Sequence, residues 1–318
     1  MKKSCLWVVM LIGLALICAC QKKEAPAPSA QKKLTVVTTL FPLYDFARAV
    51  GGERADVTLL MPPGVEPHSF EPKPEDIVKV NRADLFVFTN AYMEPWAKSF
   101  VNSLPAGNAT TVVDSSKGVN FIKAGPEEED EGEHGGEHHH HGGMDPHIWL
   151  DFANAQIMVD NIAAAMIARD PAGREYYTTR AAAYREELSK LDDAYRAGLA
   201  GCRKHLLLHG GHYAFGYLAK RYGLTYVSAA AVNADAEPTP ARLAELVRLM
   251  RENGLKYVFS EELLAPRSAE TIAKETGAQV LILHGAHNIS RDDFAKGVTF
   301  VSLMKKNLEN LRTGLECR

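Results

Sequence analysis

Short β-branched and aromatic runs alternate with helical runs twice along this chain, and this alternation constrains the fold more than any other feature. In the first stretch we expect strands at 34–39, 57–61, 84–89 and 110–114, with helices at 43–50, 74–83 and 95–103. In the second we expect strands at 204–208, 224–228, 256–260 and 279–283, with helices at 213–223, 240–253 and 266–276 and a final helix. Strands separated by helices pair in parallel, so the pattern predicts an α/β fold of two βα lobes with parallel-type sheets.

The residues between the two stretches read as one long helix. They begin with Pro171 and carry Tyr, Leu and Ala at helical spacing. A helix of this length would be about 40 Å long, which is enough to bridge two lobes. Two shorter helices would fit the same residues. We therefore expect an N-terminal lobe at 34–170, a linking helix at 171–200 and a C-terminal lobe at 201–318.

The first residues resemble an export signal. Two lysines precede an apolar run at 6–17, which is too short for a confident membrane span because the hydrocarbon core is roughly 30 Å thick. The pattern resembles a bacterial lipoprotein signal at 1–19 with lipid on Cys20, while Cys18 fits worse because it follows a bulky isoleucine. The polar residues 20–33 would then tether a soluble body to a membrane.

Removal of this signal would leave two cysteines besides the lipidated one. Cys202 and Cys317 would then face an oxidising compartment, in which cysteine pairs form disulfides. A bond between them and two unpaired thiols are both compatible with the sequence, because spacing alone does not fix the geometry.

Length and charge narrow the class of protein. At roughly 150 residues per domain, 318 residues suffice for two hydrophobic cores. The 36 Lys and Arg against 39 Asp and Glu leave a net charge of -3, which argues against a nucleic-acid-binding protein.

Residues 127–143 form an insert of unusual composition. They include seven acidic residues, five histidines and five glycines. Such a segment cannot bury a core, so we expect a disordered loop. Clustered His and Glu suit weak, multisite binding of divalent metals, although a solvated loop without a role would have the same composition. The candidate ligands of this secondary metal loop are His134, His138, His139, His140 and His141.

Most of the remaining seven histidines follow predicted strands. His68 and His147 follow strands of the N-terminal lobe, and His209, His212 and His284 follow strands of the C-terminal lobe. Ligands of open α/β sheets bind beyond the carboxyl ends of the strands, so the cleft between the lobes can collect histidines from both. Several imidazoles without matching cysteines indicate a borderline cation such as Zn²⁺.

Neutral imidazoles do not cancel the charge of a dication, so carboxylates should hold their second nitrogens. A site richer in carboxylate would instead favour harder cations such as Mn²⁺. The candidate carboxylates are Glu66, Glu71, Asp145, Asp151 and Glu237.

Three motifs in order make a family recognisable. They are PPGVEPHSFEPKPEDI at 62–77, DPHIWLD at 145–151 after the His-rich insert, and HGGHYAFGYLAKRYGL at 209–224. With them the chain resembles the metal-binding solute-binding proteins of ABC importers, most closely the zinc-uptake lipoproteins, over about residues 34–311. This resemblance implies two βα lobes joined by one long helix, which limits hinge motion.

The resemblance also implies the ligands of the metal. It makes His68, His147 and His212 ligands, and leaves His209 in a supporting or incidental position. Where the family has an Asp after the last strand, this chain has LILHGAHNIS, so we expect His284 as the fourth ligand. The alternatives are His287, an acidic residue such as Glu237 or Glu262, and a water.

We therefore expect a non-enzymatic protein that captures Zn²⁺ outside the cytoplasm, in the periplasm or at the cell surface. It would be a monomer held to a membrane by its lipid, and it would deliver Zn²⁺ to an ABC permease powered by its ATPase. The rival interpretations are a manganese- or iron-binding relative, a metal-buffering lipoprotein or adhesin, and a zinc hydrolase. The hydrolase is disfavoured because the chain has no HExxH motif and a fourth histidine would close the metal site.

Overall fold

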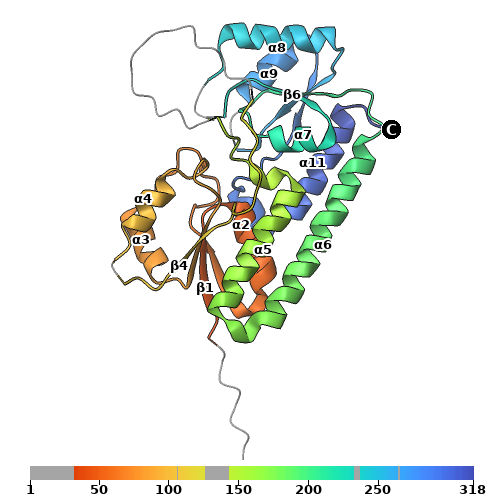
Figure 1. The fold of residues 1–318 in the computed structure, drawn as a ribbon. Helices are drawn as coiled ribbons and strands as arrows, with labels where there is room; N and C mark the ends of the chain where they lie inside the picture. Colours follow the sequence, from red (N-terminus) through yellow and green to blue (C-terminus); the bar gives the residue numbers. More distant parts are fainter. Residues whose placement is uncertain (1–31, 106, 126–142, 233–236, 264–265) are drawn as a thin grey trace, which may run out of the picture. The chain divides into compact units, whose positions relative to one another are not determined.

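The computed structural model describes residues 32–105, 107–125, 143–232, 237–263 and 266–318. Residues Lys33–Arg318 form one compact unit that contains both lobes. The helices and strands are arranged as Figure 1 shows. Within the described part of the chain, we find no helix that combines the length and the hydrophobicity of a membrane span.

Each lobe is built on a four-stranded parallel sheet. The strand orders are β2-β1-β3-β4 and β6-β5-β7-β8, and every strand pair is parallel, as the sequence predicts. The two sheets thus repeat one topology. The strands are β1 Leu34–Thr38, β2 Ala55–Leu59, β3 Leu85–Phe88 and β4 Thr111–Asp114 in the first sheet, and β5 Leu206–His209, β6 Thr225–Ser228, β7 Tyr257–Ser260 and β8 Gln279–Ile282 in the second.

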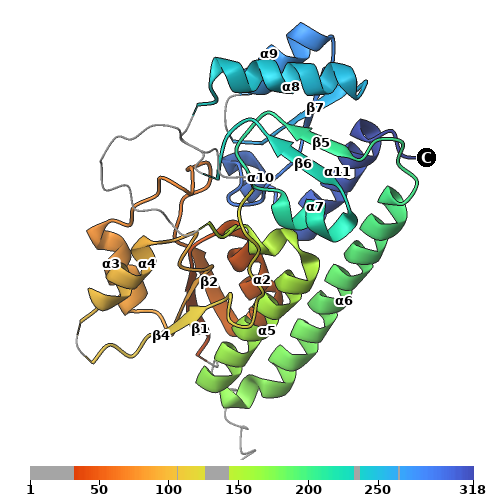
Figure 2. The same cartoon turned by 45° about the horizontal axis from the view of Figure 1, so that its top comes forward.

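Helices cover both faces of each sheet, as Figure 2 shows from a second direction. In the N-terminal lobe, side chains of α3 and α4 pack on one face, and α2 and α5 pack against the strands from the other side. In the C-terminal lobe, α8 and α9 pack on one face, and residues of α7 and α11 belong to the core on the other. The helices are α2 Phe41–Gly51, α3 Pro74–Asn81, α4 Trp96–Asn102, α5 Phe152–Arg169, α6 Arg174–Leu199, α7 Gly216–Tyr222, α8 Pro240–Glu252, α9 Arg267–Thr276, α10 Arg291–Ala295 and α11 Phe300–Gly314; the short 3-10 turns are η1 Gly52–Arg54, η2 Ile148–Leu150 and η3 Pro171–Gly173.

The long connecting helix is a single element. After η3, α6 runs for 26 residues without interruption, so the alternative of two shorter helices is wrong. It packs against α2 and α5 near its start and against α7 and α11 further along, and it therefore contacts both lobes. Tyr184 and Tyr195 of α6 are buried in the shared core.

The sequence did not lead us to expect one buried helix, α5. The 18 residues of α5 pack against α2 and α6, with Met158, Val159 and Ile162 fully buried. The side chain of Asp151 caps its start by accepting hydrogen bonds from the backbone of Ala153, at 2.8 Å, and of Asn154.

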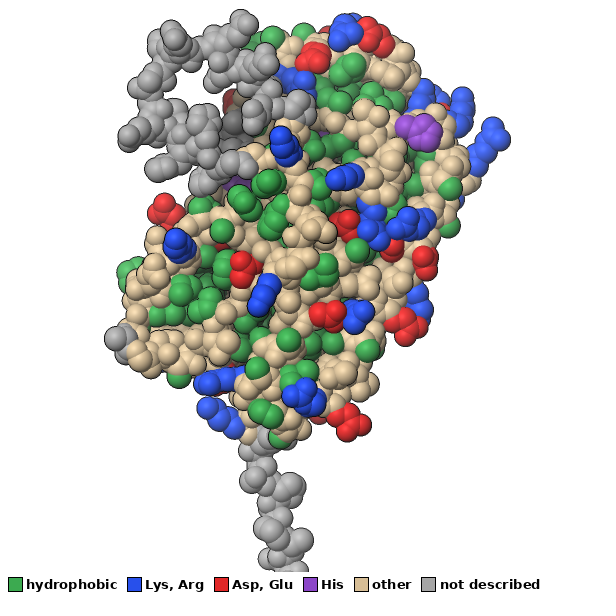
Figure 3. Space-filling model, viewed as in Figure 1, with side chains coloured by type: hydrophobic (Ala, Val, Ile, Leu, Met, Phe, Trp, Pro, Cys, Tyr) green, Lys and Arg blue, Asp and Glu red, His purple; other side chains and the backbone are tan. Residues whose placement is uncertain are grey.

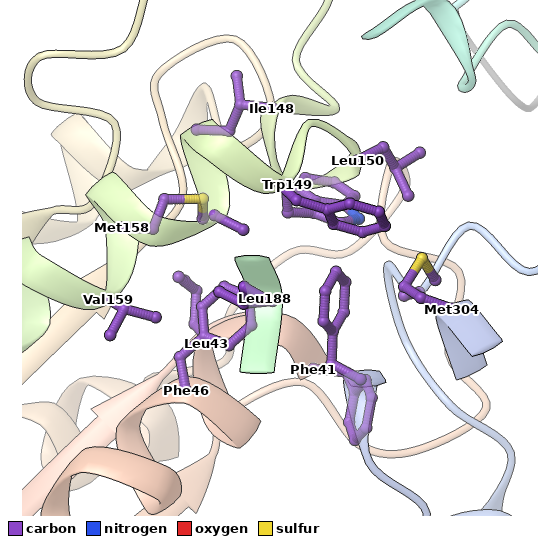
Figure 4. Packing of buried hydrophobic residues seen from close by; sticks show 14 of the residues in the cluster. Phe41, Leu43, Phe46, Ile148, Trp149, Leu150, Met158, Val159, Leu188 and Met304 are labelled. Carbon is purple, nitrogen blue, oxygen red and sulfur yellow. The ribbon is translucent and has the colours of Figure 1, made fainter. Parts of the chain in front are cut away.

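The largest core cluster is continuous between the lobes. Phe41 of α2, Trp149 of η2 and Met304 of α11 are all fully buried members of it. Figure 4 shows these side chains together with Leu188 of α6. A shared core opposes wide opening of the lobes, because separating them would expose apolar surface to water.

A disulfide closes the far end of the C-terminal lobe. Cys202 follows α6, Cys317 follows α11, and the two are bonded across 115 residues of sequence. The structure therefore confirms the pairing that the sequence left open.

Surface charge agrees with the small net charge. In Figure 3, side chains of Lys and Arg are interspersed with those of Asp and Glu across the visible face. This face carries no broad patch of a single sign.

Candidate metal centre

Four histidines from both lobes meet at the carboxyl ends of the strands. His68 lies in the loop after β2, His147 immediately precedes η2, His212 follows β5 and His287 follows β8. Each supplies a ring nitrogen, and these four atoms all lie within 4.8 Å of one another. The six pairs of rings have centroid distances between 4.8 and 5.6 Å.

The spacing suits one small cation. Four nitrogens at roughly 2.0–2.1 Å from a tetrahedral Zn²⁺ would be about 3.4 Å apart, so a modest contraction completes the site. The Nε2 atom of all four histidines is buried and has no hydrogen-bond partner among the described residues. Buried polar atoms are normally satisfied, so this cluster of imidazoles is a candidate to hold a cation.

Asp145 orients the ring of His147. His147 Nδ1 lies 2.7 Å from Asp145 Oδ1, and the backbone N–H of His147 donates to the same oxygen at 3.0 Å. Both residues are fully buried. Burial raises the pKa of Asp145 to about 8, although the backbone hydrogen bond opposes this. Burial and the neighbouring histidines hold the pKa of His147 well below its usual range, so the ring is neutral and its Nε2 can bind a metal.

Glu261 has the corresponding role for His212. It directly follows β7, and its Oε2 lies 2.6 Å from His212 Nδ1. Burial alone would raise the pKa of Glu261. The close contact with the His212 ring and the charge of that ring outweigh the effect of burial and lower the pKa of Glu261 to about 2. For His212, burial would lower the pKa, but the neighbouring Glu261 outweighs burial and leaves the pKa of His212 raised. A side chain at Gly211 would collide with Glu261, so the glycine permits this close approach.

His68 and His287 complete the group from opposite lobes. Burial, reinforced by the nearby His212, lowers the pKa of His68 to about 3. Burial also holds the pKa of His287 well below its usual range. The ring of His287 packs against Trp149, with centroids 5.3 Å apart, and against the backbone at Gly285, where any side chain would collide with it. Both imidazoles are therefore neutral and held in place.

The remaining predicted residues lie elsewhere. His284, which we expected as the fourth ligand, is outside the group of four. Its Nδ1 faces Glu262 Oε1 at 3.0 Å and accepts a hydrogen bond from the backbone N–H of Ala286. His209 is buried against Phe215, with its Nδ1 3.1 Å from the carbonyl oxygen of His212, so it supports that loop.

Of the carboxylates proposed to hold second nitrogens, Asp145 is in position. Glu66 Oε1 accepts instead from the backbone N–H of His68, and Asp151 caps α5 and pairs with Arg221 at 2.8 Å. Glu71 and Glu237 are exposed. Glu261 was missed, and its position directly after a strand at the same sheet edge was the available signal. Cys20 and the five histidines of the insert lie outside the described residues.

The sequence is similar to known zinc-uptake proteins over nearly its whole length. The family described as zinc-uptake complex component A, periplasmic, matches residues 36–314. The high-affinity zinc uptake system protein ZnuA of Bacillus subtilis is 40% identical over 316 residues, covering 99% of this chain and 98% of that protein. The zinc-binding lipoprotein AdcA of Streptococcus pneumoniae is 36% identical over 98% of this chain, which spans 61% of AdcA.

Solved structures share the fold. The metal-dependent lipoprotein YcdH of Bacillus subtilis superposes with a TM-score of 0.75 at 37% identity, covering 89% of this chain and 99% of that one. The Zn(II)-bound ZnuA-like domain of Streptococcus pneumoniae AdcA gives 0.74 at 33% identity, with the same two coverages.

Proposed function

Because this chain belongs to the family of periplasmic zinc-uptake components, we propose that His68, His147, His212 and His287 hold the Zn²⁺ ion that it captures for import. The chain is the zinc-binding component of an ABC-type zinc importer. Its partners are accordingly a membrane permease and the ATPase that powers it. Zn²⁺ is the cargo, so the site must bind it outside the cytoplasm and release it at the permease.

The observation that carries the ligand assignment is the convergence of one ring nitrogen from each of four histidines, all of which also have a buried Nε2 without a hydrogen-bond partner among the described residues. Asp145 contacts Nδ1 of His147 and Glu261 lies beside Nδ1 of His212, an arrangement that leaves Nε2 of each ring available for a metal. Carboxylates that orient histidines in this way are characteristic of zinc sites.

The donor set also favours Zn²⁺ over harder cations. Four imidazoles suit borderline metals, whereas Mn²⁺ prefers oxygen donors. The ionised Glu261 is held near the ligands without occupying a coordination position, and a dication bound by His147 would favour ionisation of Asp145. The protein can therefore offset the charge of the ion while presenting it only nitrogen.

A transport role suits this geometry better than hydrolysis. Zinc hydrolases keep one position open for water, and the metal lowers the pKa of that water to about 7. In the proposed ligand set, a fourth imidazole would fill the tetrahedron. Four protein ligands would hold the ion and leave no open coordination position for an activated water.

We further propose that the protein is exported and anchored as a monomer through lipid on Cys20. The N-terminal pattern and the lipoprotein names of several relatives support this. Metabolic labelling with a fatty acid tests it, because Cys20→Ser should abolish labelling and release the protein from the membrane.

Zinc titration with a competing chelator tests the ligand assignment. The test uses protein from which residues 127–143 have been deleted, so that the His-rich insert cannot contribute. We expect one tight site, which His68→Ala, His147→Ala, His212→Ala or His287→Ala each weakens by at least a hundredfold. His284→Ala is the matched control and should change the affinity by less than a few-fold. Equal losses for His284→Ala and His287→Ala would refute the assignment.

A further inference from the structure

Asn288 joins the two loops that carry His68 and His287. Its side chain is fully buried, and its Nδ2 donates to the carbonyl oxygens of Pro62 and Val65, each at 2.8 Å. Pro62 and Val65 belong to the N-terminal lobe, whereas Asn288 follows β8 of the C-terminal lobe. One amide group therefore spans the lobe boundary beside the metal centre.

Two backbone hydrogen bonds reinforce this connection. The N–H of Gly64 donates to the carbonyl oxygen of Ile289 at 2.8 Å, and the N–H of Phe41 donates to that of His287 at 3.2 Å. The Oδ1 of Asn288 accepts from the N–H of Ile289 at 2.8 Å, which fixes the orientation of the amide. All polar atoms of the side chain are thus used.

None of these hydrogen bonds involves a ring nitrogen. They join backbone groups and one amide, so a metal ion is not needed to form them. Within its own lobe the loop after β2 is held by contacts that include the hydrogen bond from the N–H of Val65 to the carbonyl oxygen of Pro62 and the packing of Phe70 on Trp96 of α4, with centroids 5.9 Å apart. Without Asn288, fewer contacts would tie this loop to the opposite lobe.

We propose that Asn288 is a positioning residue that clamps the His68 loop to the His287 loop before Zn²⁺ arrives. The clamp keeps ligands from both lobes at binding distance in the metal-free protein. Zinc binding then requires little closure of the lobes. This inference rests on the proposed ligand set only for its effect on affinity, because the clamp itself is a property of the metal-free chain.

The expected loss of zinc affinity follows from the fraction of metal-free protein that is ready to bind. When only a fraction of the protein is competent to bind, the apparent dissociation constant rises by the inverse of that fraction. Two buried hydrogen bonds are together worth roughly a five- to hundredfold change in an equilibrium. Loss of the clamp should therefore weaken zinc binding within that range through slower association, because the loaded state retains its four ligands.

The chain provides a matched control. Asn161 of α5 also donates through Nδ2 to two backbone carbonyl oxygens, those of Ser115 and Lys117, at 2.9 and 2.8 Å. Both acceptors lie in the same lobe as Asn161. Asn161→Ala therefore removes the same pair of contacts without breaking a connection between lobes.

The experiment measures amide hydrogen exchange of residues 60–70, together with zinc association and dissociation rates, in Asn288→Ala, Asn161→Ala and the unchanged protein. Asn288→Leu is a second variant that fills the space of the amide, in case Asn288→Ala unfolds. We expect both Asn288 variants to exchange at least five times faster at Gly64 when metal-free, and to associate with zinc more slowly. Asn161→Ala should match the unchanged protein in this segment.

Unaltered exchange in the metal-free Asn288 variants would overturn the proposal, whatever their zinc affinity. Faster dissociation with unchanged association would also overturn it, because the contact would then act only after binding. Absence of tight zinc binding in the unchanged protein would contradict the proposed ligand set and would leave the exchange result as an independent test of the clamp.

Discussion

Replacing Glu261 by glutamine should weaken zinc binding without disturbing the fold. The carboxylate lies 2.6 Å from His212 Nδ1, and the bond and charge of His212 overcome its burial to hold its pKa at about 2. It is therefore ionised at every pH at which the protein would work. Glutamine keeps the shape and one acceptor oxygen but removes the negative charge.

The size of the effect can be worked from the geometry. Adding the Zn–N bond, the width of the imidazole ring and the 2.6 Å contact places the carboxylate about 6–7 Å from the ion. Coulomb's law at an effective dielectric constant of about 20 gives roughly 5 kcal/mol for charges of +2 and -1 at that distance, which is an upper limit. Because glutamine keeps one oxygen that can face His212, and because changing a residue that orients a metal ligand typically costs ten- to hundredfold, we expect a loss of affinity in that range.

Chelator competition at fixed pH and ionic strength measures this loss. Glu262→Gln is the matched control, because Glu262 faces His284 and the backbone N–H of Gly285 instead of a proposed ligand. Its effect should stay within a few-fold. Unchanged affinity in Glu261→Gln, or equal losses in the two variants, would refute the electrostatic role of Glu261.

Three further predictions concern pH, the disulfide and Trp149. Zinc must displace protons from His212 and Asp145, because the pKa values of both are raised. The apparent zinc dissociation constant should therefore rise about tenfold or more for each pH unit below neutrality, in zinc titrations at a series of fixed pH values. Replacing Cys202 and Cys317 by serine should lower the free energy of unfolding by roughly 2–5 kcal/mol in denaturant titrations while leaving zinc affinity unchanged. Trp149→Phe removes the indole hydrogen bond to the carbonyl of the loop after β8 and should weaken zinc binding by roughly tenfold in the same competition assay.

The architecture was largely readable from the sequence. All eight strands lie within two residues of the predicted ranges, because most of them are short runs of apolar and β-branched residues. The long helix α6 was predicted from a different pattern, because its buried tyrosines and leucines recur at helical spacing. Local patterning and the tertiary structure agree in these elements.

The helix α5 could not be read in the same way. Its sequence FANAQIMVDNIAAAMIAR has small and apolar residues around much of its circumference, so no polar face marks its period. The helix lies between α2 and α6, which explains this composition. Such a segment can be assigned as a buried helix only when the elements that pack against it are known.

The metal centre was partly predictable. The strand-end rule brings His68 and His147 of the N-terminal lobe and His212 of the C-terminal lobe to the cleft between the two sheets, and the structure groups them. The same rule cannot choose between His284 and His287, because both follow β8. That choice depends on how the chain turns at Gly285 and at Ala286, where φ is 58°, and spacing does not encode such a turn.

X-ray absorption at the zinc edge most directly tests whether four imidazoles from both lobes hold one ion. The sample is the 1:1 zinc complex of protein lacking residues 127–143. The account predicts four nitrogen neighbours at about 2.0 Å with the outer-shell scattering of imidazole rings, and three such neighbours in His287→Ala. A first shell that contains carboxylate oxygen, or one unchanged by His287→Ala, would contradict it.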